Sequence, residues 1–202
     1  MTDLTALALV CTLTPSPAAS SSELLATQVL DALKELGVPG SQLRIVDHDV
    51  KPGVETDMGD GDAWPGIRER ILAADILVLA TPIWMGQPSS VAKRVLERLD
   101  AELSETKEDG TPSMFGKVAV VAVVGNEDGA HNVSADAFQA LNDVGFTIPA
   151  QGVTYWVGEA MQQLDYQDKK GATPKTAETT ALVARNAAHL VRLMRDAPYP
   201  KQ

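Results

Sequence analysis

The chain has 202 residues and a net charge of −10, from 17 basic and 27 acidic side chains. This acidic balance argues against binding to nucleic acids or to an anionic membrane, because both need a basic surface. The single cysteine, Cys11, excludes an internal disulfide. The sequence also shows no signal peptide and no membrane span, and together these features predict a cytoplasmic protein.

Short apolar runs alternate with helical patterns along the chain. Buried strands are expected at 4–11, 43–46, 76–80 and 118–124, with a fifth inside 147–156. Helices are expected at 23–36, 64–73, 89–103, 133–144 and 177–195. Strands that are apolar on both faces indicate a parallel sheet covered by helices on each side. The alternation therefore predicts a doubly wound α/β fold, with residues 1–202 forming one domain.

The connecting segments divide into two kinds. Segments 50–62 and 104–116 are rich in glycine, proline or charge, and we expect them to be mobile. The loops after the first, third and fourth strands have a different meaning, because ligands of open parallel sheets bind outside the carboxyl ends of the strands. These three loops are the candidate ligand-binding segments.

The loop at 12–22 follows the first strand and opens a helix. Its hydroxyl groups belong to Thr12, Thr14, Ser16, Ser20, Ser21 and Ser22. A helix N-terminus adds free amides and a partial positive charge, which together favour phosphate binding. The alternative is that Ser21 or Ser22 is only an N-cap. The loop has neither the GxGxxG nor the Walker pattern and contains no Lys or Arg, which argues against an ATPase or an ordinary dinucleotide site.

The loop at 81–90 follows the third strand. Pro82 and Pro88 stiffen it, and Gly86 lets the backbone approach a ligand closely. Trp84 and Met85 place bulky apolar side chains at a strand end, which suggests a flat aromatic partner. The alternative is that Trp84 packs on a neighbouring helix or on a dimer partner.

The loop at 125–131 follows the fourth strand. Gly125 and Gly129 permit tight turns, and the side chains of Asn126, Glu127 and Asp128 offer hydrogen bonds to a polar ring edge. His131 could donate a hydrogen bond or a proton. The alternatives are a solvated turn at 127–129 and a surface histidine.

We expect no metal site, because no second histidine is near His131. We expect Cys11 to be a core residue.

The three loops resemble those of the NADPH-dependent FMN reductase family, within the flavodoxin-like superfamily. The resemblance extends over about residues 4–193 and is carried by Ser20–Ser22, Thr81–Gly86 and Gly125–His131. It implies a flavodoxin-like three-layer sandwich, with a five-stranded parallel sheet in the order 2-1-3-4-5. The cofactor-binding residues it implies are Thr12, Ser20, Ser21, Ser22, Pro82, Ile83, Trp84, Met85, Gly86, Gly125, Asn126, Glu127, Asp128 and Gly129. Ser20–Ser22 would hold the FMN phosphate, Pro82–Gly86 would lie against the isoalloxazine ring, and Gly125–Gly129 would contact the ring's polar edge.

The sequence departs from the family pattern in two loops. Many relatives carry Arg or Asn in the phosphate loop, where this chain has Pro17, Ala18 and Ala19. Relatives also often have Tyr or Asn where Ile83 and Trp84 stand, which affects the choice of substrate. The segment 155–160 also resembles a loop that some relatives use near the flavin.

The resemblance implies an oxidoreductase in which FMN takes electrons from NADH or NADPH and passes them to a quinone, a flavin or a similar small-molecule acceptor. His131 is the expected catalytic residue, as a proton donor to the product. The family usually dimerises, so we expect a homodimer or homotetramer. The alternatives are a flavodoxin-type electron carrier, and an α/β scaffold or binder of another phosphorylated ligand. We favour the enzyme because a carrier seldom needs the segments 50–62 and 104–116.

Overall fold

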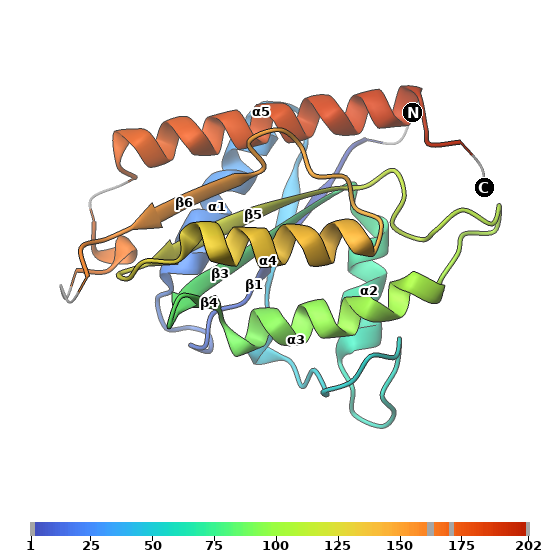
Figure 1. The fold of residues 1–202 in the computed structure, drawn as a ribbon, viewed down its shortest axis with the longest axis horizontal. Helices are drawn as coiled ribbons and strands as arrows, with labels where there is room; N and C mark the ends of the chain where they lie inside the picture. Colours follow the sequence, from blue (N-terminus) through green and yellow to red (C-terminus); the bar gives the residue numbers. More distant parts are fainter. Residues whose placement is uncertain (1–2, 161–163, 170–171, 201–202) are drawn as a thin grey trace.

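The apolar runs of the sequence form the central sheet of the protein. The structure is a computed structural model that describes residues 3–160, 164–169 and 172–200 (Figure 1). Its parallel strands lie in the order β2-β1-β3-β5-β6, and the short strand β4 pairs antiparallel with β3. The strands are β1 (Ala6–Val10), β2 (Gly40–Arg44), β3 (Ile76–Trp84), β4 (Gln87–Pro88), β5 (Val118–Gly125) and β6 (Val153–Val157). The predicted fold class and strand order are confirmed.

In the part of the chain that the structure describes, five α-helices cover the two faces of the sheet. They are α1 (Ser21–Glu35), α2 (Trp64–Ala73), α3 (Ser90–Leu99), α4 (Ala130–Asp143) and α5 (Pro174–Asp196). Alternate side chains of β1 point to opposite faces: Leu7 and Leu9 pack in the core beneath α2, α3 and α4, whereas Ala8 and Val10 pack in the core beneath α1 and α5. The result is a three-layer sandwich (Figure 1).

The strands expected at 43–46 and 76–80 were wrong at their boundaries, and the second of them continues to Trp84. The strand expected at 43–46 runs from Gly40 to Arg44, and Ile45–Asp47 form a 3-10 helix instead. Among the described residues, this edge strand pairs with β1 alone. Its first three residues are polar or small and exposed, so its sequence has no apolar period. The fifth strand, expected inside 147–156, is Val153–Val157 and ends one residue beyond that segment, and Thr147 makes an isolated bridge to Val118.

The helix expected at 89–103 is also shorter than predicted. The α-helix ends at Leu99 and continues as the 3-10 helix Asp100–Ser104. Within this turn, the buried carboxylate of Glu102 accepts hydrogen bonds from Arg68 and from the hydroxyl of Ser113. Arg68 also pairs with the carboxylate of Glu105, so residues near both ends of the segment 104–116, which was expected to be mobile, are held to the protein.

The segment 50–62, expected to be mobile, is held to α3 by buried charge. Arg98 and Asp62 are both fully buried, and Nη1 of Arg98 lies 2.7 Å from Oδ2 of Asp62. The same guanidinium donates hydrogen bonds to the backbone carbonyls of Lys51 and Glu55 and lies over the ring of Trp64. These contacts fix the segment rather than leave it loose. Within the described part of the chain, no helix is long and apolar enough to cross a membrane.

Candidate functional site

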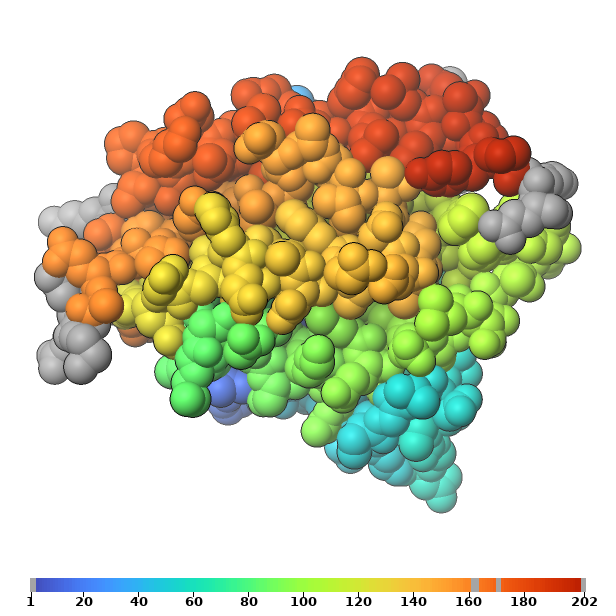
Figure 2. Space-filling view, in the orientation of Figure 1, coloured from blue at the N-terminus to red at the C-terminus, as the bar shows by residue number. Residues whose placement is uncertain are grey.

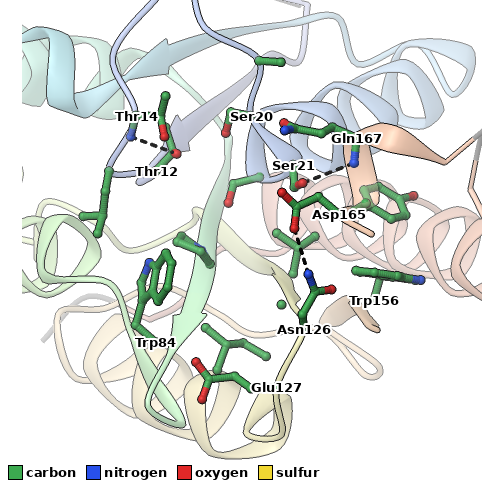
Figure 3. Close-up of a pocket in the computed structure, with 18 residues that line it drawn as sticks. Thr12, Thr14, Ser20, Ser21, Trp84, Asn126, Glu127, Trp156, Asp165 and Gln167 are labelled. Carbon is green, nitrogen blue, oxygen red and sulfur yellow. Dashed lines mark hydrogen bonds between the residues drawn. The ribbon is translucent and has the colours of Figure 1, made fainter. Parts of the chain in front are cut away.

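A cavity of about 290 Å³ opens at the carboxyl ends of β1, β3, β5 and β6. Its wall comes from the loop after β1, the end of β3, the loop after β5 and a segment before α5 (Figure 3). The lining residues are Thr12, Leu13, Thr14, Ala19–Ser22, Pro82–Trp84, Val124–Glu127, Trp156 and Asp165–Gln167. This is the edge of a parallel sheet at which ligands bind.

The N-terminus of α1 provides free backbone donors at one end of the cavity. Ser20 is the N-cap, and its hydroxyl accepts a hydrogen bond from the N–H of Glu23 at 3.3 Å; the N-cap is therefore not Ser21 or Ser22. The first N–H groups of a helix have no carbonyl one turn earlier to bond. The cap thus leaves the N–H groups of Ser20, Ser21 and Ser22 for a ligand, beside the hydroxyl of Thr12. Such an arrangement favours an anion.

A cation lies behind this loop, although the loop itself contains none. Arg44 is 6% exposed, and its Nη1 donates hydrogen bonds to the carbonyls of Thr14 (3.1 Å) and Ala18 (2.8 Å). Its Nη2 pairs with the carboxylate of Glu23. Arg44 does not line the cavity. The sequence analysis did not single out Arg44, which lies inside the strand expected at 43–46.

The segment 81–90, predicted as a loop, is a β-hairpin. Ile83 pairs with Pro88 and Trp84 pairs with Gln87. Between them Met85 (φ 53°) and Gly86 (φ 73°) both have positive φ, as a tight two-residue hairpin turn requires. Trp84 lines the cavity and remains 54% exposed, which argues against the alternative that it packs on a neighbouring helix. The alternative that it packs on a dimer partner stays open.

The hairpin is fixed to the loop after β5. The N–H of Met85 donates to Oε1 of Glu127 at 2.8 Å, and the side-chain amide of Asn132 donates to the carbonyl of Gly86 at 3.0 Å. Gly129 packs so closely that a Cβ there would lie 2.7 Å from Cα of Gly86. In the space-filling view the green hairpin lies directly beside the yellow start of α4 (Figure 2). Glu127, predicted to meet a ligand, thus also holds the backbone of the hairpin.

A fourth wall, which the sequence did not predict, comes from Asp165, Tyr166 and Gln167. Asn126 donates to the carboxylate of Asp165 at 2.8 Å, and the N–H of Gln167 donates to the hydroxyl of Ser21 at 3.2 Å (Figure 3). Tyr166 is 1% exposed and donates its hydroxyl to Gln28 in α1; burial raises the pKa of this phenol. The wall lies in a polar stretch without periodicity, which explains why no strand or helix signal marked it.

The structure brings ten of the predicted site residues into the cavity wall and leaves the others outside it. Those in the wall are Thr12, Ser20, Ser21, Ser22, Pro82, Ile83, Trp84, Gly125, Asn126 and Glu127. Met85, Gly86, Asp128, Gly129 and His131 do not line the cavity. His131 is exposed, with its ring edge-on to Tyr155 at 5.5 Å between ring centroids. Its surroundings therefore give no support to a catalytic role.

Cys11 lies in the core, as predicted. It is fully buried, its thiol lies 3.7 Å from the carbonyl of Leu9, and burial raises the pKa of the thiol. A thiol held in this protonated form is a poor nucleophile. Among the described residues, no group of three or more His, Cys, Asp or Glu side chains could hold a metal ion.

The donor set of the cavity fits a phosphorylated aromatic ligand. Hydroxyls and helix amides lie at one end, while Ile83, Trp84 and Trp156 supply apolar surface elsewhere (Figure 3). In the wall, the side-chain oxygens of Asn126 and Gln167 are buried without a hydrogen-bond partner. Buried acceptors of this kind are costly unless a donor reaches them, and the N–H and hydroxyl groups of a flavin nucleotide are such donors. FMN therefore suits this cavity.

Comparison with known proteins agrees with this geometry. The model of the NADPH-dependent FMN reductase family matches residues 6–162. Over 206 residues, the chain is 31% identical to 8-demethyl-8-aminoriboflavin-5′-phosphate synthase from Streptomyces davaonensis, covering 97% of this chain and 80% of that protein. It is also 37% identical over 199 residues to a Mycobacterium bovis protein named divalent metal cation transporter MntH. That match covers 95% of this chain but only 29% of the other protein, so the transporter's name says nothing about this segment.

Solved structures show the same architecture. RosB with the bound intermediate 8-demethyl-8-formylriboflavin-5′-phosphate superposes with a TM-score of 0.88 at 31% identity, covering 97% of this chain and 82% of that one. The apo form of the NADH:FMN oxidoreductase EmoB gives a TM-score of 0.64 at 18% identity, covering 98% of this chain and 94% of that one. At that lower identity the likeness concerns the fold alone.

Proposed function

The chain belongs to the NADPH-dependent FMN reductase family, whose cofactors are FMN and NAD(P)H, and from this we propose that the cavity at the carboxyl edge of the sheet is its FMN site. The observation that carries the proposal is the polarity of the wall. One end offers hydroxyls and the free amides of α1, and the other offers the exposed indole of Trp84. A phosphate with a flat ring at the far end of a polyol chain has this same distribution of chemistry.

In this proposal the residues of the wall divide their work by segment. Thr12 and Ser20–Ser22 would hold the phosphate with hydroxyl and N–H groups. Pro82–Trp84 would lie against the ring, and Gly125–Glu127 would meet its polar edge. FMN, when bound, supplies the hydride chemistry. The protein's part is to orient the ring and to leave one side open at Trp84 for the electron donor and the acceptor.

We propose that the reaction is oxidation of NADH or NADPH with transfer of electrons to a small acceptor. The S. davaonensis relative makes a flavin phosphate according to its name, which favours a flavin over a quinone as the acceptor. Proton donation by His131 and assembly into a homodimer or homotetramer stay predictions. So does the expectation that residues 1–202 form one domain.

The test is an assay of NADH and NADPH oxidation by the purified protein with FMN, riboflavin or a quinone in excess. Turnover without any added reductase supports the proposed enzyme. FMN binding without such turnover would instead favour an electron carrier of the flavodoxin type. Binding of a different phosphorylated ligand in place of FMN would contradict both.

A further inference from the structure

The end of strand β2 supports the phosphate end of the cavity from behind. Arg44 donates hydrogen bonds to two carbonyls of the loop after β1, those of Thr14 and Ala18. Three residues later, the carboxylate of Asp47 accepts hydrogen bonds from the N–H (2.8 Å) and the hydroxyl (2.5 Å) of Ser16. The bonds from Ser16 hold the pKa of Asp47 below its usual value. The loop at 12–20 is thus fixed at three points by two side chains of one neighbouring segment.

The contacts of Arg44 suit a positioning role better than a direct charge on a ligand. Its guanidinium is buried, does not line the cavity, and is paired with Glu23 in the first turn of α1. The guanidinium donates hydrogen bonds to two carbonyl oxygens of the loop. A carbonyl oxygen held in this way cannot turn toward the phosphate and repel it. The planar fork of arginine can hold two carbonyls and a carboxylate at once.

We infer that Arg44 is a specificity-determining residue, which fixes the loop at 12–20 in the form that accepts a phosphate ester and so makes the protein prefer FMN to riboflavin. The inference rests on the proposed function, because it takes the phosphate to lie at this loop. The ring end of the cavity is built from other segments, so loss of Arg44 leaves ring binding in place. The preference between the two flavins, not flavin binding as such, is the property at stake.

The experiment compares the dissociation constants of FMN and riboflavin, each measured by quenching of flavin fluorescence. In Arg44→Met, FMN binding weakens about 10- to 100-fold, as expected for lost hydrogen bonds from a charged group, while riboflavin binding changes by less than about threefold. Asp47 is exposed and holds Ser16 of the same loop. Asp47→Ala therefore also weakens FMN binding relative to riboflavin binding, by a smaller factor than Arg44→Met. This second variant keeps the test open if Arg44→Met does not fold.

The matched control is Arg98→Met. Arg98 is also a buried arginine that donates to two carbonyls of one loop and pairs with a carboxylate, but residues 51–62 do not line the cavity. In this control both dissociation constants stay unchanged or change by one common factor. If Arg44→Met and Asp47→Ala change the dissociation constants of FMN and riboflavin by the same factor, or change neither, the inference about Arg44 is overturned while the proposed function stands. Failure of the unaltered protein to bind FMN would overturn the proposed function itself.

Discussion

The carboxylate of Glu127 accepts a hydrogen bond from the backbone N–H of Met85 at 2.8 Å and joins two loops that lie 42 residues apart in the sequence. Met85 has a φ of 53°, which is unfavourable for any residue other than glycine, so this turn needs support from its neighbours. Through this bond the loop after β5 positions the hairpin that carries Trp84. The ring end of the cavity therefore depends on a contact outside the hairpin.

Replacing Glu127 with alanine should weaken FMN binding by a factor of about three to ten, because a hydrogen bond of this kind contributes about 0.5–1.5 kcal/mol. Glu127→Gln is the matched control, since its amide oxygen can still accept from Met85. Fluorescence titration of both variants measures the effect. Equal affinities in Glu127→Ala and the unaltered protein would show that the hairpin does not need this bond.

Gly129 should tolerate no side chain, for reasons of space as well as conformation. Its φ is +127°, and a Cβ would meet three backbone atoms of Gly86 at 2.7–3.1 Å. Gly110 is a control for conformation alone, because it also has positive φ but nothing lies within 4 Å of its Cβ position. We expect Gly110→Ala to cost about 1–2 kcal/mol of unfolding free energy and Gly129→Ala at least about 1 kcal/mol more. Urea denaturation tests this, and equal losses would contradict it.

The buried pair of Asp62 and Arg98 should control stability in acid. Burial raises the pKa of Asp62, but hydrogen bonds from the N–H of Met58 and from Arg98 outweigh that effect and lower the pKa to about 2. Because the unfolded carboxyl titrates near pH 4, the stabilisation is complete above about pH 4 and is lost as the pH falls toward about 2. Asp62→Asn should flatten the fall of unfolding free energy over this range.

At neutral pH the same substitution leaves the Arg98 charge buried without its partner, which typically costs about 3–5 kcal/mol. Glu178→Gln is a suitable control, because its ion pair with Lys175 is exposed and contributes little. Denaturant unfolding between pH 2 and pH 7 measures both effects. An Asp62→Asn variant with the unaltered protein's pH dependence would show that another carboxyl is responsible.

Trp84→Ala should weaken FMN and riboflavin binding by the same factor, in contrast to Arg44→Met, because the indole would contact the ring that both flavins share. Aromatic contacts contribute about 0.5–1.5 kcal/mol beyond buried area, so about a twofold to tenfold loss is expected. Leu193→Ala, a substitution of a similarly exposed apolar residue outside the cavity wall, serves as the control. A loss confined to FMN would place Trp84 at the phosphate end instead.

The sequence predicted best what depends on neighbouring residues. The fully apolar run from Val118 to Val124 is a central strand buried on both faces, and hydrophobic burial alone makes that pattern readable. The polar strand Gly40–Arg44 lies at the sheet edge, has no such pattern, and was misplaced. The hairpin was read as a loop because Pro82 and Pro88 break strand signals, while its turn depends on backbone geometry at Met85 and Gly86.

The parts of the site that the sequence did not predict depend on contacts between distant segments. Arg44 meets Thr14 across 30 residues, and Tyr166 meets Gln28 across 138. No periodicity encodes such pairs, because they arise only when the sheet brings separate strand ends together. The hydroxyls of Ser20–Ser22 were predictable because strand, loop and helix N-terminus follow one another directly in the chain.

Binding of FMN in the cavity can be measured by titrating FMN with the purified protein and following its visible absorption. We expect shifted flavin absorption bands that saturate at about one FMN per chain, as for a single site with the ring in contact with Trp84. An FMN spectrum that stays unchanged at every protein concentration would contradict it.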